Sequence, residues 1–335
     1  MTGRVFVTGC AGFLGSHFVR ALTLEGRAIL GYDALTYAGD MARLRDSLGG
    51  PGFEFARGDI VARDAVRAAV RRAAPDTVVH FAAESHVTRG ETDADRFDRT
   101  NVLGTRVVLE ESARADVTRF VHVSTDEVYG PIVSGAFEED DKQPGPGLAT
   151  SAYARSKAMA DDLARSFAGK MEVVVVRPTN CFGPWQHPEK ALPRWITSAL
   201  LGEPVPVWGD GRQIRQWLFA MDLAAAIELI VDAADPDPVY NVGPRHAPEI
   251  TNLDLARWVA SDLGQPAETV VLTTYDRPDH DRRYAVDPTR IEGLGWNPGD
   301  VWLNFERTVD WYRRHRAWWV PLRAEAESIY RDRPA

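Results

Sequence analysis

Three consecutive residues, Thr125, Asp126 and Glu127, have side chains that could hold a hydroxyl group, donate a proton and accept a proton. They follow a short apolar segment at residues 120–123, which predicts a strand that ends beside them. An acid next to a base suits the elimination of water, because one carboxyl group must be protonated while its neighbour is ionised. The alternative is an ordinary solvated acidic pair at the end of a strand.

Tyr153 and Lys157 are four residues apart, which places both side chains on one face of a helix. Ser151 or Thr150 would cap the start of that helix. A Lys ammonium group beside a phenol lowers the pKa of the phenol, so Tyr153 could serve as a base toward an alcohol or sugar hydroxyl. The alternative is a chance pair on an ordinary helix.

Gly9, Gly12 and Gly15 are spaced by three residues between an expected strand and an expected helix. Such glycines let the backbone approach a diphosphate, and the helix start offers free N–H groups and a partial positive charge. Asp33, at the end of the next expected strand, would accept bonds from ribose hydroxyls and repel a 2′-phosphate, which favours NAD over NADP. A turn without a ligand is the alternative, since a glycine-rich turn alone is a weak signal.

The elements that must position these residues alternate between strands and helices. Apolar, β-branched segments predict strands and amphipathic segments predict helices. This alternation is typical of the α/β class, with a doubly wound parallel (Rossmann) sheet covered by helices on both faces. The expected strands are residues 4–8, 28–32, 53–56, 77–81, 119–123 and 171–177, and the expected helices of this part include 16–25 and 64–72.

The composition changes after Asn180, where five prolines lie between residues 184 and 206. This change indicates that the chain leaves the first domain. An expected helix at 221–233 and a strand at 240–242 could return to the first sheet. We therefore predict an NAD-binding Rossmann domain from residues 1–180 plus about 216–242. A smaller C-terminal substrate-binding domain would comprise about 181–215 and 243–335.

Composition excludes several classes of protein. The net charge of −9 gives no basic surface for nucleic acid. The two cysteines, Cys10 and Cys181, have no metal-ligand spacing and form no disulfide framework, so we expect no metal and a reducing, cytoplasmic location. No apolar stretch reaches the length of a membrane span, and the N-terminus enters a strand pattern without a leader.

Together these motifs resemble the extended short-chain dehydrogenase/reductase superfamily, and within it the dTDP-glucose 4,6-dehydratases. The resemblance extends over nearly the whole chain. It is carried by T-G-x-x-G-x-x-G at residues 8–15, H-F-A-A-E-S-H-V at 80–87, S-T-D-E-V-Y-G at 124–130 and Y-x-x-x-K at 153–157. Further matching segments are 33–39, 183–190, 209–215, 240–243 and 280–284.

The resemblance implies a lyase that removes water from a nucleoside-diphosphate glucose and yields a 4-keto-6-deoxy sugar. Oxidation at C4 acidifies the C5–H bond, which explains why a dehydratase would need NAD. Tyr153 would take the C4 hydroxyl proton, Thr125 would hold that hydroxyl, Glu127 would remove the C5 proton and Asp126 would protonate the departing C6 hydroxyl. The hydride then returns to C6, and the cofactor ends unchanged.

The resemblance also implies two sets of binding residues. The NAD contacts would be Gly9, Gly12, Phe13, Leu14, Gly15, Asp33, Ala34, Leu35, Thr36, Asp59, Ile60, Phe81, Ala82, Ala83, Ser85, Thr100, Tyr153, Lys157 and Cys181. The nucleotide-sugar contacts would be Ser85, Thr125, Asn180, Glu189, Lys190, Val205, Pro206, Val207, Arg215, Asn241, His280, Asp281, Arg282 and Tyr284, with Arg215 foremost for the diphosphate because Arg binds phosphate bidentately.

The partners implied are a nucleotide sugar, most simply dTDP-glucose, and a second copy of the chain. The dimer would form through helices near 102–115 and 153–167. Other functions remain open at this stage. A sugar-nucleotide 4-epimerase usually lacks the acidic pair, and a UDP-glucuronate decarboxylase typically has Ser in place of Asp126. Asp126 therefore separates the dehydratase from these relatives. A non-catalytic NAD-binding regulatory protein and a preference for UDP over dTDP also remain open.

Overall fold

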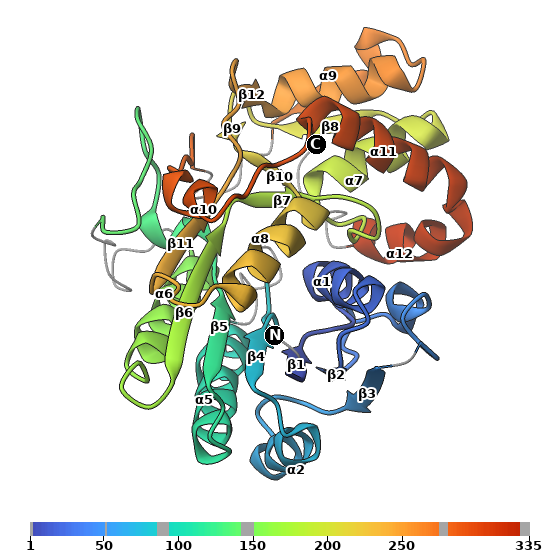
Figure 1. Ribbon diagram of the computed structural model, residues 1–335. Coiled ribbons are helices and arrows are strands. Elements are labelled where there is room, and N and C mark those ends of the chain that lie inside the picture. The colour runs from blue at the N-terminus through green and yellow to red at the C-terminus, as the bar shows by residue number, and fades with distance from the viewer. Residues whose placement is uncertain (1–2, 51, 86–93, 142–150, 275–280, 329–335) are drawn as a thin grey trace.

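The structure is a computed structural model that describes residues 3–50, 52–85, 94–141, 151–274 and 281–328. Its centre is one seven-stranded sheet in which every pair of neighbouring strands is parallel (Figure 1). The strand order is β11-β6-β5-β4-β1-β2-β3. The strands are β1 (Val5–Thr8), β2 (Ile29–Asp33), β3 (Phe53–Arg57), β4 (Thr77–His80), β5 (Arg119–Val123), β6 (Glu172–Pro178) and β11 (Val239–Val242).

Helices cover both faces of this sheet, because alternate strand residues point in opposite directions. Val5 and Val7 of β1 pack into one hydrophobic cluster with α1 (Phe13–Leu24) and α8 (Ala220–Asp232). Phe6, between them, packs into a second cluster with α2 (Arg63–Ala73) and α5 (Thr105–Arg114). The predicted doubly wound α/β fold is confirmed.

The strand order reverses between β1 and β4. β1 is paired with β2 on one side and with β4 on the other. The chain that follows β1 therefore runs toward one edge of the sheet, and the chain that follows β4 runs toward the other edge. Ligands of doubly wound proteins bind beyond the carboxyl ends of the strands at such a reversal. The Gly9–Gly15 turn, the residues after β5 and the start of α6 (Ala152–Arg165) all meet at this edge.

A third hydrophobic cluster forms the core of a second region, which is built from elements that follow β6 in the chain. Short two-stranded sheets and helices surround it, and they lie above the central sheet in Figure 1. The helices are α7 (Ala191–Leu201), α9 (Asn252–Asp262), α11 (Val301–Arg314) and α12 (Arg316–Ser328). The strand pairs are β7 (Asn180–Phe182) with β10 (Trp217–Phe219), β8 (Val205–Trp208) with β13 (Val270–Thr273), and β9 (Ile214–Arg215) with β12 (Ile250–Thr251).

The chain returns from this upper region to the central sheet through α8 and β11, which follow one another in the sequence. Helix α8 packs beside α1, and β11 pairs with β6 at the edge of the sheet. The remaining elements are short: α4 (Ala94–Phe97), the π-helix η2 (Asp98–Gly104), α10 (Thr289–Gly293), and the 3-10 helices η1 (Met41–Leu44), η3 (Asp126–Tyr129) and η5 (Ala267–Thr269). The domain boundaries at about residues 180, 216 and 242 stay a prediction. Within the described residues, no helix combines the length and the apolar character needed to cross a membrane.

Candidate active site

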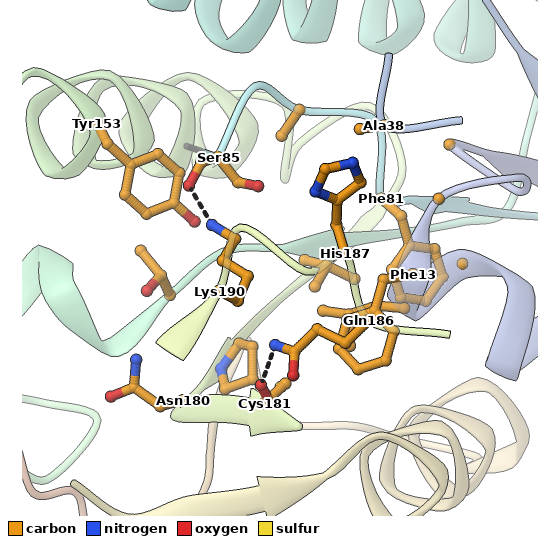
Figure 2. Close-up of a pocket in the computed structure, with 18 of the residues that line it drawn as sticks. Phe13, Ala38, Phe81, Ser85, Tyr153, Asn180, Cys181, Gln186, His187 and Lys190 are labelled. Carbon is orange, nitrogen blue, oxygen red and sulfur yellow. Dashed lines mark hydrogen bonds between the residues drawn. The ribbon is translucent and has the colours of Figure 1, made fainter. Parts of the chain in front are cut away.

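A pocket of about 270 Å³ lies at the carboxyl ends of the central strands. Figure 2 shows its walls, which come from segments far apart in the sequence. The predicted residues that line it are Gly9, Gly12, Phe13, Leu14, Gly15, Phe81, Ala83, Ser85, Thr125, Asp126, Glu127, Tyr153, Lys157, Asn180, Cys181, Glu189 and Lys190. The structure therefore brings all five predicted catalytic side chains to one place.

The glycine turn has the geometry of a cradle for a ligand. Gly9 has a φ of 68°, which a residue with a side chain rarely adopts. A Cβ on Gly15 would lie 2.2 Å from the Gly9 carbonyl oxygen, so only glycine lets α1 start this close to the turn. Gly12 caps α1 with no side-chain bond to the first N–H groups. These N–H groups therefore face the pocket edge as anion donors.

Asp33 lies at the end of β2, beside this turn. Its carboxylate accepts hydrogen bonds from the Ala11 backbone N–H at 2.9 Å and from the Leu35 N–H at 2.8 Å. Burial raises the pKa of Asp33, and the two backbone bonds act in the opposite direction. Asp33 itself is outside the residues that line the pocket, as are the predicted NAD contacts Ala34, Leu35, Thr36, Asp59, Ile60, Ala82 and Thr100.

The acidic pair begins the 3-10 helix η3 rather than ending a strand. Thr125 caps this helix, and its Oγ1 accepts a bond from the Glu127 N–H at 3.3 Å. Asp126 is buried, and its Oδ1 accepts a bond from the Thr125 hydroxyl at 3.3 Å. Burial and, second to it, the Glu127 carboxylate raise the pKa of Asp126 to about 7, although the Arg215 charge opposes both. Asp126 can thus hold a proton at neutral pH next to the carboxyl group of Glu127.

Helix α6 carries the Tyr–Lys pair on one face, as the spacing predicts. Ser151 is the cap, and its Oγ accepts a bond from the Ala154 N–H at 3.0 Å. The Lys157 Nζ donates to the Val123 carbonyl at the end of β5, at 2.7 Å. Burial lowers the pKa of Lys157 to about 8, and Asp161 acts in the opposite direction.

The phenol of Tyr153 differs from the prediction. Burial raises the pKa of Tyr153 above its ordinary value, the Glu127 charge adds to this, and the bond with Thr125 opposes it. In the chain alone these raising effects outweigh the predicted lowering by Lys157, whose ammonium group bonds to the Val123 carbonyl. A positive charge from outside the chain, such as that of an oxidised nicotinamide, would lower the pKa of the phenol.

The predicted sugar-nucleotide residues divide into two groups. Ser85, Asn180, Glu189 and Lys190 line the pocket, and the Lys190 Nζ donates to the Ser85 carbonyl at 3.0 Å (Figure 2). Outside its lining lie Val205, Pro206, Val207, Arg215, Asn241, Asp281, Arg282 and Tyr284. His280 lies outside the described residues.

Arg215 lies near the acidic step without lining the pocket. Its guanidinium group lies 4.7 Å above the Tyr284 ring and donates to the Asp281 carbonyl at 2.9 Å. Its positive charge lowers the pKa of Asp126, so it is close enough to act on that carboxyl group. The Tyr284 hydroxyl donates to the Asp281 carboxylate.

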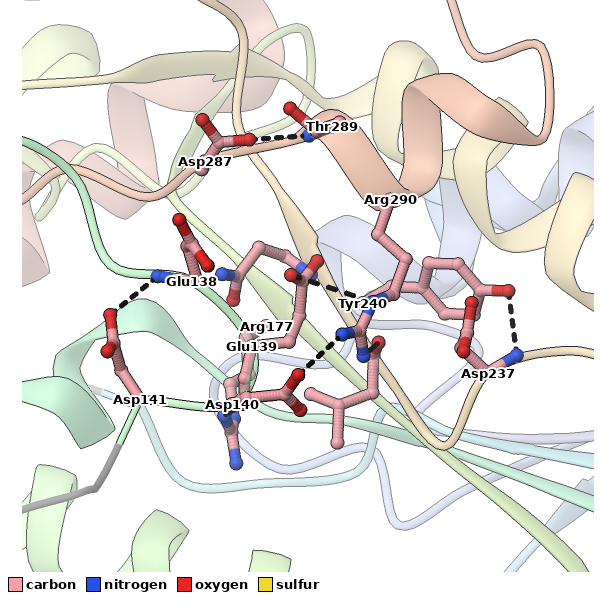
Figure 3. A network of polar contacts seen from close by, with 12 residues as sticks. Glu138, Glu139, Asp140, Asp141, Arg177, Asp237, Tyr240, Asp287, Thr289 and Arg290 are labelled. Atoms are coloured by element: carbon pink, nitrogen blue, oxygen red, sulfur yellow. Dashed lines mark hydrogen bonds and ion pairs between the residues drawn. The ribbon is translucent and has the colours of Figure 1, made fainter.

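Two predicted contacts have other partners. The Asn241 amide accepts from the Tyr129 hydroxyl at 2.9 Å and donates to the Phe137 carbonyl at 3.0 Å. Figure 3 shows the polar network near this strand, in which Arg290 is paired with Asp140 at 3.1 Å. Arg282 is exposed and forms an ion pair with Asp210 at 2.9 Å. The structure thus keeps Asn241 and Arg282 apart from the pocket.

Sequence reasoning did not select nine residues that line the pocket: Tyr37, Ala38, Arg43, Val123, Ser124, Pro178, Thr179, Gln186 and His187. Gln186 and His187 fall inside the matching segment 183–190, and Tyr37 and Ala38 fall inside 33–39, so those segments contained a signal for them. Gln186 donates to the Cys181 carbonyl at 2.8 Å (Figure 2). Arg43 had no such signal, because it is one arginine among many outside every motif.

The chain is similar to known proteins over nearly their full length. A dTDP-glucose 4,6-dehydratase of Streptomyces niveus is 42% identical to the chain, with 97% of each chain covered. A solved dTDP-glucose 4,6-dehydratase of Streptomyces venezuelae with NAD bound is 39% identical, with a TM-score of 0.89, and the match covers 95% of this chain and 99% of that one.

A more distant solved structure is the UDP-glucose 4-epimerase of Thermotoga maritima with UDP-glucose. It is 26% identical, with a TM-score of 0.84, and the match covers 93% of this chain and 99% of that one. The model of the NAD dependent epimerase/dehydratase family matches residues 5–243. That range contains the glycine turn, the acidic step and the Tyr–Lys pair, and we conclude that the chain belongs to the NAD dependent epimerase/dehydratase family.

Proposed function

We propose that the chain is an NAD-dependent dTDP-glucose 4,6-dehydratase, a hydro-lyase that forms the 4-keto-6-deoxy sugar. The observation that carries this proposal is the buried Asp126 next to Glu127 in the pocket that also contains Tyr153. The raised pKa of Asp126 supports a proton donor at neutral pH. The names of the relatives at about 40% identity agree with it.

The chain fits NAD on its own geometry. A Cβ at Gly9 or Gly15 would meet backbone atoms, so only glycine permits this tight turn at the start of α1, and the Asp33 carboxylate lies at the end of the next strand. The glycine turn would hold the diphosphate, Asp33 the adenosine ribose, and Phe81 and Ala83 the wall beside the nicotinamide. When bound, oxidised NAD supplies a hydride acceptor and a positive charge that favours the phenolate form of Tyr153.

The side chains then divide the proton transfers. Thr125 holds the C4 hydroxyl group and Tyr153 removes its proton as C4 is oxidised to the ketone. Glu127 removes the acidified C5 proton while Asp126 gives its proton to the C6 hydroxyl, which leaves as water. The hydride returns to C6 and a proton returns to C5. Lys157, bonded to Val123, keeps the helix with Tyr153 in place at the end of β5.

The substrate proposal is a dTDP-sugar. Asn180, Glu189 and Lys190 offer an amide, a carboxylate and an ammonium group along one wall of the pocket. Arg215, whose positive charge acts on Asp126, is the proposed diphosphate contact beyond that wall. The choice between dTDP and UDP is part of the proposal, and it follows the names of the relatives.

We further propose a homodimer in a reducing compartment such as the cytoplasm. Helices α5 and α6, which cover one face of the sheet side by side, are the proposed dimer surface. Leu103, at the start of this helical region, is an exposed large apolar residue, as a contact surface requires. Both cysteines, Cys10 and Cys181, are free thiols, which supports the reducing compartment.

The test is incubation of the purified protein with dTDP-glucose and NAD⁺, followed by mass spectrometry of the nucleotide sugar. We expect a product that has lost one water and that carries a 4-keto group, with no net formation of NADH. UDP-glucose in a parallel reaction measures the base preference. A product of unchanged mass, which would be a 4-epimer, or no product from a protein with bound NAD would overturn the assignment.

A further inference from the structure

Arg43 is a buried arginine that lines the pocket and that the proposed mechanism does not use. It lies in η1, the short helix that follows the Asp33 segment, and Asp40 caps that helix through the Ala42 N–H at 2.8 Å. Its guanidinium group points into the pocket wall between the glycine turn and the 183–190 segment, as its bonds establish.

Three backbone carbonyl groups hold this guanidinium group. Its Nε donates to the Trp185 carbonyl at 3.1 Å, and its Nη1 donates to the Ala11 carbonyl at 3.0 Å and to the Ala38 carbonyl. Ala11 belongs to the glycine turn, Ala38 to the segment 33–39 and Trp185 to the segment 183–190, and each of these segments contributes residues to the pocket lining. Arg43 therefore connects three segments that form the pocket.

Aromatic rings fix one of these carbonyl groups in position. Trp185 has a φ of 67°, a conformation that bulky residues rarely adopt. Its ring lies 4.7 Å from the ring of Trp311 and 5.1 Å from that of Trp318, both on the C-terminal helices. A strained backbone persists only where its surroundings determine it. Since Trp318 also lies 5.6 Å from the Arg43 guanidinium group, the cluster orients both partners of the Nε bond.

The positive charge of Arg43 has no ion-pair partner within 4 Å among the described residues, and its Nη2 atom has no hydrogen-bond partner there. Nη2 is absent from the buried polar atoms that lack a hydrogen-bond partner, so it retains accessible surface, and Arg43 is one of the residues that line the pocket. The acidic groups that act on Arg43 are Asp40, Asp33 and Glu189. Asp40 already accepts a bond from the Trp318 indole at 2.7 Å, and Asp33 accepts two backbone bonds. A buried, unpaired cation with two free N–H donors is suited to an anionic oxygen.

We propose that Arg43 binds the diphosphate of the dinucleotide through Nη2, while its other nitrogens hold the pocket walls. This inference rests on the proposed function, because it takes NAD as the ligand. The glycine turn decides between the two diphosphates that the pocket could meet: Nη1 bonds to Ala11 inside that turn, so Arg43 lies on the dinucleotide side and not on the nucleotide-sugar side.

The experiment compares Arg43→Gln with the wild type by titration calorimetry, using NAD⁺, ADP-ribose, adenosine and dTDP as separate probes. We expect NAD⁺ and ADP-ribose to bind about 10- to 100-fold more weakly to the variant, as the loss of a charged hydrogen bond predicts. Adenosine, which has no phosphate, and dTDP should change by less than about 2-fold. Arg45→Gln, which removes a neighbouring exposed arginine, is the control for net charge and should bind all four probes like the wild type.

Each other outcome overturns the proposal. Unchanged ADP-ribose binding would exclude the contact, an equal loss for adenosine would leave Arg43 with only a wall-holding role, and a loss confined to dTDP would move it to the sugar-nucleotide side. Arg43→Lys retains the charge without the fork of donors and should weaken ADP-ribose binding about 3- to 10-fold, which keeps the test decisive if the Gln variant does not fold. Wild-type protein that binds no NAD⁺ at all would instead refute the proposed function.

Discussion

Asp126, in η3, and Asp161, in α6, are two buried carboxylates whose environments act in opposite directions. Asp126 is 3% exposed and Asp161 is 0% exposed, so burial alone does not distinguish them. Burial, together with the neighbouring Glu127, raises the pKa of Asp126 to about 7. The pKa of Asp161 is lowered, because the charges and bonds around it outweigh the cost of burial.

The difference comes from the partners. Asp161 accepts a hydrogen bond from Arg177 at 3.1 Å, and the His122 ring lies 3.5 Å away. Arg177, which is labelled in Figure 3, in turn donates to the Tyr129 hydroxyl at 2.6 Å. Asp126 has a hydroxyl partner in Thr125, another acid beside it, and only the more distant charge of Arg215. One carboxylate is thus held ionised as part of the structure, and the other is kept ready to release a proton.

The first way to test this comparison is Asp126→Asn, which keeps the shape and removes the proton donor. We expect the rate of water loss from dTDP-glucose to fall about 10²- to 10⁴-fold, as the loss of general acid catalysis predicts. Hydride transfer to NAD⁺, measured as NADH absorbance in a single turnover, should persist. Asp235→Asn, at an exposed acid, is the matched control. Loss of NADH formation in Asp126→Asn would show that Asp126 acts in the oxidation at C4 and that the assigned roles are wrong.

The second test is Asp161→Asn, which leaves Arg177 buried without its carboxylate. Breaking a buried ion pair on one side should lower the free energy of unfolding by about 3–5 kcal/mol. Urea denaturation of this variant, of Asp126→Asn and of the wild type measures the difference. We expect Asp126→Asn to be as stable as the wild type or more stable at neutral pH. Equal destabilisation by the two variants would contradict the comparison.

The smallest expected effect is the dependence of stability on pH. Asp126 has a folded-state pKa raised from 3.8 to about 7, so its contribution is fully present below pH 3.8 and is lost as the pH rises through about 7. Replacement by Asn removes that loss, and the variant should gain stability relative to the wild type between pH 5 and 7, by at most about 2–3 kcal/mol.

Asp161 provides the control for this slope. Its pKa is lowered, so its contribution is present above pH 3.8 and is lost only as the pH falls further through the folded pKa. The difference between Asp161→Asn and the wild type should therefore stay constant from pH 5 to 8. Chemical denaturation at steps of pH measures both variants. A slope of the opposite sign for Asp126→Asn would mean that this carboxyl group is ionised in the folded protein.

Much of the fold follows from local patterns. Short β-branched segments became the central strands with ends that differ by at most one residue, because a strand buried on both faces must be apolar along its whole length. The predicted helix at residues 16–25 begins earlier, at Phe13, since the glycine turn is tight enough for α1 to start directly after Gly12. The sequence indicated that a strand near residues 240–242 could return to the first sheet. Its position at the edge, beside β6, depended on long-range pairing that the sequence did not decide.

The candidate site divides in the same way. Motif spacing predicted five candidate catalytic residues that the pocket brings together, because they lie next to glycine turns, strand ends or each other in the chain. Spacing did not predict that burial would raise the pKa of Tyr153, since burial depends on the elements that cover the ring. Asn241 matched a family motif, yet its amide bonds to Tyr129 and Phe137 instead of facing the pocket.

By itself, the sequence determined which chemical groups are available: an acidic pair, a Tyr–Lys pair and a glycine turn at the ends of parallel strands. Only the tertiary structure decided their charge states and the partners outside the motifs. Asp161 meets Arg177 across two elements, and Arg43 meets carbonyl groups from three segments of the chain. The physical reason is that desolvation and hydrogen bonding depend on distances in space, which spacing along the chain does not encode.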